Sequence, residues 1–237
     1  MPGILGIIGG LGPEATVFYY RLAVRLYRAS KGGSPRVVIY SIPLEEMCDS
    51  VKSGSRERVA SLLEEALRGL AASGATVALI AANTPHIAWR EALETAEALG
   101  VKLVSIFEPA AAEALRRGYR RVGILATSAT LEAGFYQEAL KRRGIEAVHP
   151  PGDVQRRLDQ AIERLALGGP EEPPLEVVVD ALKQLEEMGV DAAMIACTDL
   201  SPHADKLAGQ AKLPLIDASL EHVKAAVSIL EGLGSGP

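Results

Sequence analysis

The chain has few of the residues that build covalent or metal-held scaffolds. Its 237 residues include only two cysteines, Cys48 and Cys197. Two thiols cannot form the several disulfides of a small secreted domain, and alone they cannot complete a four-ligand structural zinc site. Asparagine occurs once, as Asn83. The sequence therefore predicts a protein with no disulfide framework and no metal.

Long apolar runs and an excess of positive charge are also absent. No apolar run approaches the roughly 20 residues that cross a bilayer. The opening residues, from Met1 to Leu5, lack the basic segment of a signal peptide. The 25 basic and 30 acidic side chains give a formal charge of −5, which argues against nucleic acid as a partner. We expect a cytoplasmic protein that binds neither membranes nor nucleic acid.

The chain does contain ample material for a core, since 48% of its residues are apolar. Short apolar runs alternate with segments of helical periodicity, which predicts an α/β fold with parallel sheets covered by helices on both faces. The expected strands are Ile4–Ile8, Val37–Ser41, Val77–Ala81, Leu103–Ile106, Val122–Ala126, Ala192–Ala196 and Leu213–Ile216. The clearest helical segments are Glu57–Ala72, Pro109–Arg117, Leu131–Arg143 and Leu175–Met188.

An internal repeat divides the chain. Gly6–Gly10 resembles the segment that starts at Gly123, at an offset of 117 residues, and Gly74–Thr84 resembles Gly189–Asp199, at an offset of 115. Matches in the same order, with a slowly drifting offset, indicate a duplicated half. We therefore predict two pseudo-symmetric lobes, each a parallel sheet flanked by helices. The first lobe is expected to hold residues 1–106 and 217–237, and the second residues 107–216.

Polar segments follow the repeated strands, where parallel sheets bind their ligands. In the first half these segments are Gly9–Thr16 and Ala82–His86, and in the second half they are Thr127–Thr130 and Cys197–Asp199. We expect them to line one active-site cleft between the two lobes.

Cys197 is the most reactive side chain among these segments. A thiol at a strand end, beside hydroxyl and backbone donors, can act as base, acid or nucleophile, although a cysteine at the end of an apolar strand can also be a small core residue. Asn83 and Thr84 can donate hydrogen bonds to a carboxylate, and the Thr84 hydroxyl can relay a proton. His86 either titrates near neutrality or has a structural role.

The glycine-rich segment from Gly9 to Thr16 can bring backbone amides, such as those of Gly10 and Leu11, close to an anion. It does not bind a dinucleotide by the usual motif, because Gly10-x-Gly12 continues into Ala15 where a third glycine is required. No phosphate-binding Gly-Lys-Ser/Thr loop occurs. In the second half, Thr127, Ser128 and Thr130 offer hydroxyl and amide groups at the equivalent place.

Three of these segments, Gly9–Thr16, Asn83-Thr84-x-His86 and Cys197–Leu200, resemble the pyridoxal-independent aspartate/glutamate racemase family, and in particular its aspartate racemase branch. The resemblance covers the whole chain. It implies two lobes with the site between them, a homodimer, and no cofactor. It also implies that two cysteines on opposite sides of the substrate α-carbon remove and return a proton.

The resemblance assigns roles to individual residues. Cys197 corresponds to the second catalytic cysteine, and Asp199 stands where the family usually has glutamate. Ala82 occupies the position of the missing first cysteine, so Thr84 or water would have to replace that thiol. The implied substrate-binding residues are Gly10, Leu11, Asn83, Thr84, Thr127, Ser128, Thr130, Thr198 and Asp199.

Two departures leave the function open. The arginine and lysine that hold the side-chain carboxylate in aspartate-specific members are missing near Cys48 and Ala166. We therefore expect an amino acid or a dicarboxylate as substrate and leave the identity of its side chain open. We expect Cys48 to be a bystander. Besides an amino-acid racemase, the sequence allows a single-cysteine enzyme that resembles the arylmalonate decarboxylases. It also allows a non-catalytic amino-acid-binding protein.

Overall fold

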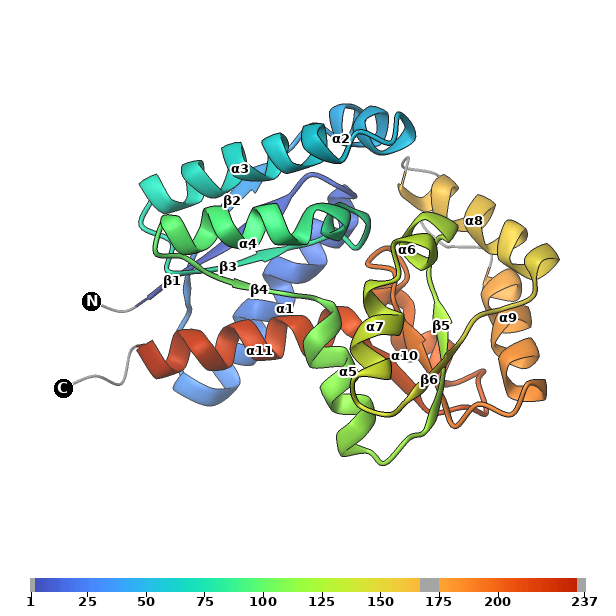
Figure 1. The fold of residues 1–237 in the computed structure, drawn as a ribbon. Coiled ribbons are helices and arrows are strands. Elements are labelled where there is room, and N and C mark those ends of the chain that lie inside the picture. Colours follow the sequence, from blue (N-terminus) through green and yellow to red (C-terminus); the bar gives the residue numbers. More distant parts are fainter. Residues whose placement is uncertain (1–2, 167–174, 234–237) are drawn as a thin grey trace. The chain divides into compact units, whose positions relative to one another are not determined.

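The computed structural model describes residues 3–166 and 175–233. The chain forms two compact units. One contains the residues up to Ile106 together with those from His222 onward, and the other extends from Phe107 to Glu221. Figure 1 labels the helices and strands of both units.

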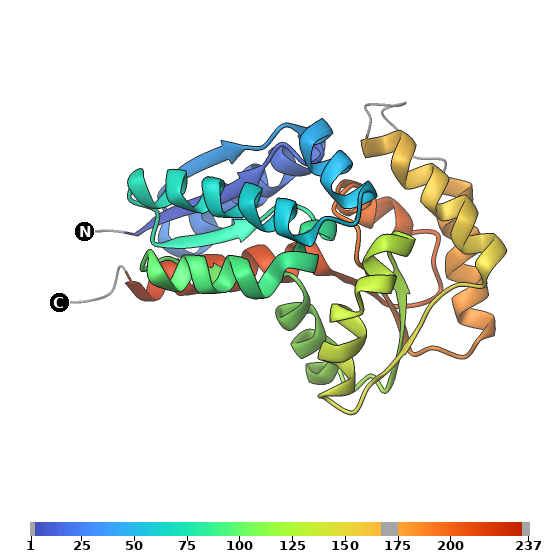
Figure 2. The ribbon, with the colours of Figure 1, turned by 45° about the horizontal axis from the view of Figure 1, so that its top comes forward.

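The first unit is built around a four-stranded parallel sheet with the order β2-β1-β3-β4. Figures 1 and 2 show helices α3 and α4 on one face of this sheet and α1 and α11 on the other. The strands are β1 (Ile4–Gly9), β2 (Arg36–Ser41), β3 (Val77–Ile80) and β4 (Lys102–Val104). The helices are α1 (Pro13–Lys31), α2 (Leu44–Lys52), α3 (Arg56–Ala72), the 3₁₀ helix η1 (Thr84–Ala88), α4 (Trp89–Ala98) and, from His222 onward, α11 (Ala218–Leu233).

The second unit repeats the arrangement with a four-stranded parallel sheet of order β6-β5-β7-β8. Helices α5 and α7 lie on one side of this sheet and α8 and α9 on the other (Figure 1). The strands are β5 (Arg121–Leu125), β6 (Glu146–Val148), β7 (Ala192–Ile195) and β8 (Leu215–Asp217). The helices are α5 (Phe107–Arg116), α6 (Ser128–Ala133), α7 (Phe135–Lys141), α8 (Gly152–Ala166), α9 (Leu175–Glu187), the 3₁₀ helix η2 (Ser201–His203) and α10 (Ala204–Ala208).

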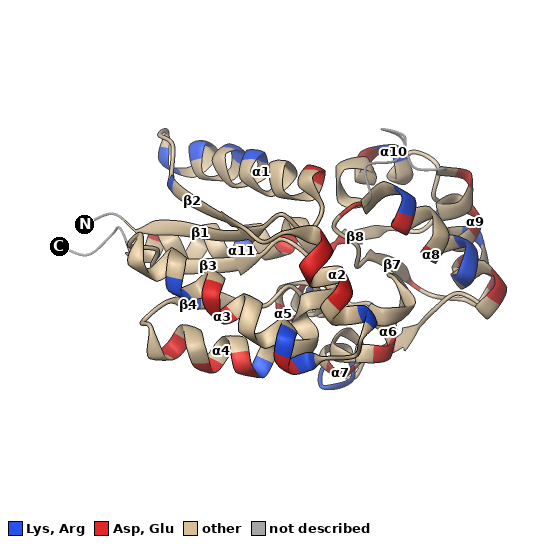
Figure 3. Ribbon diagram, turned by 90° about the horizontal axis from the view of Figure 1, so that it is seen from above, with Lys and Arg blue, Asp and Glu red and all other residues tan. Residues whose placement is uncertain are grey.

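The predicted α/β class, with two parallel sheets flanked by helices, is confirmed. The central strands β1, β3 and β7 consist entirely of uncharged residues, and Figure 3 shows the charged residues mainly on the helices. This distribution is what a sheet buried on both faces requires.

Two details differ from the expected elements. The helix expected over Leu131–Arg143 is two helices, because Gly134 has a left-handed backbone (φ 73°) that ends α6 before α7 begins. Strand β6 was not predicted, since its three residues begin with the exposed Glu146 and form no apolar run.

The internal repeat has a physical counterpart in the way each sheet packs on a helix. Gly6 of β1 and Gly123 of β5 occupy equivalent repeat positions. A Cβ added at Gly6 would lie 2.9 Å from Leu70 of α3, and one added at Gly123 would lie 2.7 Å from Leu185 of α9. Both leucines are fully buried. Each half therefore uses a glycine in its first strand so that its long helix can approach the sheet.

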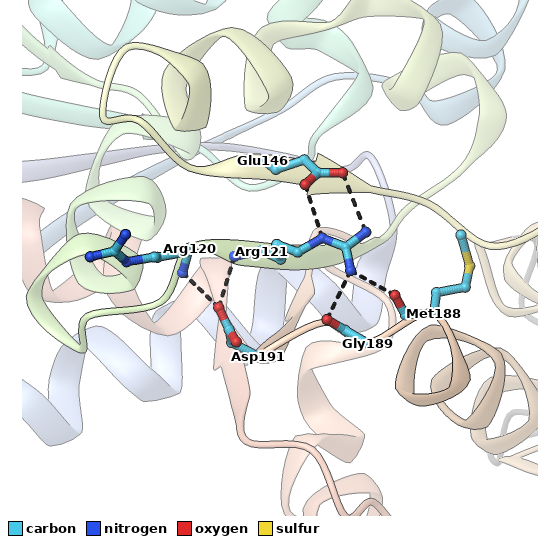
Figure 4. Close-up of polar contacts among 6 residues, drawn as sticks. All are labelled: Arg120, Arg121, Glu146, Met188, Gly189 and Asp191. Carbon is cyan, nitrogen blue, oxygen red and sulfur yellow. Dashed lines mark hydrogen bonds and ion pairs between the residues drawn. The ribbon is translucent and has the colours of Figure 1, made fainter.

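A polar network ties together the strand starts in the second unit, at the edge opposite the candidate site (Figure 4). The Asp191 carboxylate accepts hydrogen bonds from the backbone amides of Arg120 and Arg121, at 2.7 and 2.8 Å. The Arg121 guanidinium donates to Glu146 of β6 and to the carbonyl oxygen of Met188, which follows α9. These bonds fix where β5, β6 and β7 begin. Among the described residues, no helix combines the length and the apolar character needed to cross a membrane.

We predict that Gly6→Ala and Gly123→Ala each destabilise the protein by about 1–3 kcal/mol, because the new methyl group overlaps a leucine that is packed on all sides. Urea denaturation would measure the loss of unfolding free energy. The control is Gly232→Ala near the end of α11, where an added Cβ meets no atom within 4 Å and alanine favours the helix. Equal stability of all three variants would contradict the prediction.

Candidate active site

The predicted residues of the first half lie at the carboxyl edge of their own sheet. Ile8 of β1 pairs with Ile80 of β3, and the Ala81 amide donates to the Ile8 carbonyl at 2.8 Å. This pairing brings the chain after β1, with Gly10 and Leu11, beside the chain after β3, with Ala82 to Thr84. Leu11 and Ala82 are both buried and belong to one hydrophobic cluster.

The glycine-rich turn is closed by its own side chains. The Gly10 amide donates to the Thr16 hydroxyl at 2.9 Å, and that hydroxyl donates to the Gly12 carbonyl at 3.1 Å. Gly10 has φ +84°, and a Cβ there would lie 2.2 Å from the Ile42 carbonyl oxygen. Gly10 is therefore required by the close approach of the backbone at Ile42, and its amide is bound within the turn.

His86 has a structural role in this unit. Its Nδ1 donates to the Asn83 carbonyl at 3.1 Å, since a carbonyl can only accept, and its Nε2 then accepts from the Ile106 amide at 3.4 Å. The ring stacks on Trp89. Burial lowers the pKa of His86 to about 4, so the ring is neutral at pH 7. It holds the turn that carries Asn83 and Thr84.

A second buried histidine supports the same region. His222 of α11 donates from Nε2 to the Val104 carbonyl at 2.8 Å, and its Nδ1 accepts from the Tyr19 hydroxyl at 3.2 Å. Burial, together with the neighbouring His86, lowers the pKa of His222 to about 3. These bonds join α1, α11 and the end of β4 through one neutral imidazole.

The hydroxyl groups after β5 have partners within the second unit. The Thr127 hydroxyl donates to the Thr130 hydroxyl at 3.1 Å and accepts from the Thr130 amide. Ser128 donates twice to Asp159 of α8, from its amide at 2.8 Å and from its hydroxyl at 2.6 Å. The predicted anion-binding donors of Ser128 are therefore occupied by a carboxylate of the protein itself.

Cys197 is the second residue after the end of β7, at the carboxyl edge of the sheet. Its side chain is 5% exposed and packs in the hydrophobic cluster of the second unit. Burial raises its pKa, and the nearby Asp199 raises it further. Cys197 is therefore a neutral thiol at pH 7. Thr198 is buried beside it, and burial raises the pKa of the half-buried Asp199 to about 6.

A second carboxylate supports the Cys197 loop from β8. The Ser201 hydroxyl donates to Asp217 at 2.7 Å, and the Ser201 and Ser219 hydroxyls are 2.8 Å apart. The Leu200 amide donates to the Cys197 carbonyl at 3.2 Å and closes the turn. Burial raises the pKa of Asp217 to about 6.

Sequence reasoning missed three polar residues of the second unit. Asp217 is the last residue of β8 and comes directly after the predicted strand Leu213–Ile216, so the strand-end argument would have found it. Gln155 and Asp159 are one helical turn apart and lie beside the apolar stripe of α8, a spacing visible in the sequence. Cys48 lies half-buried on α2. Within residues 3–166 and 175–233, no three His, Cys, Asp or Glu side chains are grouped to hold a metal ion.

The Asp/Glu/Hydantoin racemase family profile matches residues 8–226, which is nearly the whole chain. The chain belongs to this family. The resemblance found in the sequence is thereby confirmed, and the protein is an isomerase of the racemase type.

Individual relatives agree with this assignment. The broad specificity amino-acid racemase RacX of Bacillus subtilis (strain 168) is 28% identical over 234 residues, which cover 95% of this chain and 97% of that protein. The structure is similar to that of an aspartate racemase homologue from Pyrococcus horikoshii OT3, with a TM-score of 0.77 and 30% identity over 98% of this chain and all of that one. The Picrophilus torridus aspartate racemase shares the fold, with a TM-score of 0.76 at 22% identity over 97% and 94% of the two chains.

The buried histidines predict a loss of stability in mild acid. The unfolded state binds a proton near the ordinary pKa of 6.5, whereas folded His222 stays neutral down to about pH 3. Its contribution to stability is therefore complete above pH 6.5 and is lost as the pH falls below that value. We predict that His222→Gln, which can still donate to Val104, removes about 2 kcal/mol of the stability change between pH 7 and pH 5.

Urea denaturation of both proteins at pH 7, 6 and 5 would measure this difference. Asp199 and Asp217 act in the opposite direction, because a carboxyl with a raised pKa adds stability as the pH falls below about 6. They are present in both proteins and cancel in the comparison. An unchanged pH dependence in the variant would contradict the prediction, because it would show that His222 binds its proton at the same pH in the folded and unfolded states.

Proposed function

We propose that the chain is a cofactor-independent amino-acid racemase in which the Cys197 thiol exchanges a proton with the substrate α-carbon. The observation that carries this proposal is the neutral thiol of Cys197 at the carboxyl edge of a parallel sheet, beside Asp199. Family membership and the similarity to an amino-acid racemase support the same chemistry.

Racemisation needs one proton to leave the α-carbon and another to arrive on the opposite face. When Cys197 acts as the acid, its S–H bond breaks, a C–H bond forms on the planar carbanion, and a thiolate remains. In the reverse direction the thiolate takes the α-proton. Ala82 cannot perform the second transfer, so we assign it to water, relayed by the Thr84 hydroxyl. Protons are conserved over the cycle, because solvent supplies one and receives one.

The substrate carboxylate must be well bound, because the α-proton is acidic only when the negative charge that develops is stabilised. Asn83 and Thr84 are the side-chain donors that follow β3. Thr198 offers a hydroxyl and Asp199 an acceptor for the amino group after β7. Gly10 and Leu11 contribute the shape of the turn, since the Gly10 amide donates to Thr16.

A single-cysteine decarboxylase is the second candidate. One observation favours it: the Ala82 methyl group is packed in an apolar cluster with Leu11 and Met47, as a site that expels a carboxylate as carbon dioxide would require. In that reaction the substrate loses carbon dioxide, and the Cys197 thiol alone gives a proton to the resulting carbanion. An amino-acid-binding protein without turnover is the third candidate, and ligand-induced thermal stabilisation without proton exchange would identify it.

The deciding experiment follows the α-proton of L- and D-amino acids in heavy water by NMR, with chiral chromatography of the same samples. We expect exchange with inversion by the parent protein, and a loss of at least about 100-fold in Cys197→Ser, because the thiol is the proton-transfer group. Cys48→Ser is the matched control, since it removes the other cysteine from α2, and it should keep full activity. We expect Ala82→Cys to accelerate exchange.

Each other outcome has a distinct meaning. Exchange that survives Cys197→Ser would exclude the proposed role of this thiol. Release of carbon dioxide from an aryl-substituted malonate without amino-acid exchange would favour the decarboxylase.

We also propose that the chain forms a homodimer. Val17 and Tyr20 of α1 and Ile39 of the edge strand β2 are 42–44% exposed in the single chain, so their apolar surface is available for burial against a second copy. Light scattering after size-exclusion chromatography should give twice the chain mass of 25.0 kDa. A mass of 25.0 kDa would contradict the proposal.

A further inference from the structure

Asp159 is a fixed negative charge in the second unit. Its carboxylate accepts three hydrogen bonds, from the amide and hydroxyl of Ser128 at 2.8 and 2.6 Å and from Nε2 of Gln155 at 3.0 Å. All three donors are uncharged. Its neighbour Arg157 pairs instead with Asp180 of α9, at 2.5 Å. Among the described residues, no basic side chain forms an ion pair with Asp159, so its charge is not neutralised.

The orientation of Gln155 is fixed by its partners. Its Nε2 lies between the Ala126 carbonyl oxygen, at 2.8 Å, and Asp159, at 3.0 Å. Both partners only accept, so the amide nitrogen must face them and the amide oxygen must point elsewhere. Gln155 is 7% exposed, and its Oε1 meets no donor within the described residues. Gln155 therefore serves to hold Asp159 against the end of β5.

Asp159 is held at the same sheet edge as Cys197. Leu125 of β5 pairs with Ile195 of β7, and the Ala196 amide donates to the Leu125 carbonyl at 2.9 Å. After Leu125, the next residue is Ala126, whose carbonyl accepts a hydrogen bond from Gln155. After Ala196, the next residue is Cys197. Ser128, which binds Asp159, follows two residues after Ala126.

We propose that Asp159 is a specificity-determining residue that directs the enzyme toward amino acids with neutral or basic side chains and away from dicarboxylic amino acids. The inference rests on the proposed function and specifies its substrate class. A second substrate carboxylate at this edge would have to displace Asp159 from Ser128 or lie close to its negative charge. A neutral side chain meets no such repulsion, and a basic one is attracted.

The test compares the parent with Asp159→Asn, which removes the charge but keeps an acceptor for Ser128. The control is Asp153→Asn, which removes a carboxylate from the exposed first turn of the same helix. Proton exchange is measured with aspartate, alanine and lysine. We expect kcat/KM for aspartate, relative to that for lysine, to rise about tenfold in Asp159→Asn, as the loss of one partly screened like charge predicts. The ratio should stay unchanged in Asp153→Asn.

Thermal stabilisation by the same three amino acids is measured in parallel, because it reports binding without turnover. Stabilisation that shifts from lysine toward aspartate in Asp159→Asn, in a protein without exchange, would support the inference and reject the racemase. Exchange by both proteins with the same ratio would reject the inference and leave the racemase standing. Equal changes in both variants would also overturn it, because net charge alone would then explain them. The absence of both exchange and stabilisation with every amino acid in every variant would overturn it as well.

Discussion

The parallel pairing of the two central strands in each unit is the constraint on which the site depends. Ile8 lies beside Ile80 in one sheet and Leu125 beside Ile195 in the other. In parallel pairs both strands end at the same edge of the sheet. The residues that follow the two strands are therefore brought together by the strand pairing, independently of their own conformational preferences. The strands β3 and β7 that lead to this edge are uncharged and fully buried, so polar groups are placed only where these strands end. The close packing of Leu70 and Leu185 against strand glycines holds this register in place.

Buried polar groups keep the strand-end loops in one conformation. The neutral ring of His86 donates from Nδ1 to the Asn83 carbonyl and accepts at Nε2 from the Ile106 amide. Only the tautomer with its proton on Nδ1 can form both bonds. Ser201 connects Asp217 to the turn of Cys197 in the second unit. Such groups are costly to bury without partners, so once they are paired they allow few alternative arrangements. The loops at the sheet edges of both units are therefore held in one conformation, as residues of a hydrophobic core are.

Sequence reasoning succeeded where one local signal dominates. Apolar runs identified the strands around Ile7 and Ile195, and the repeat identified the equivalence of the two sheets. It failed where the outcome depends on a partner distant in sequence. The sequence around Ser128 does not indicate that its amide and its hydroxyl both donate to Asp159, 31 residues later. The break at Gly134 was hidden because apolar residues on both sides keep a helical spacing. The burial that raises the pKa of Cys197 is likewise a property of packing, whereas the sequence left open whether this cysteine is a reactive thiol or a small core residue.

The raised pKa of Cys197 has two opposite consequences for proton transfer. Each unit by which the pKa rises lowers the thiolate population at neutral pH tenfold, but it also makes the thiolate a stronger base toward a weakly acidic α-proton. Asp199 contributes to this balance, because its negative charge disfavours the thiolate and its own pKa of about 6 places its ionisation near physiological pH. In the racemase proposed above, the ammonium group of the substrate would supply a compensating positive charge. In the proposed mechanism, an ammonium group beside Cys197 and Asp199 would lower the free-energy cost of forming the thiolate, so the thiol would become a usable base only when an amino acid is bound.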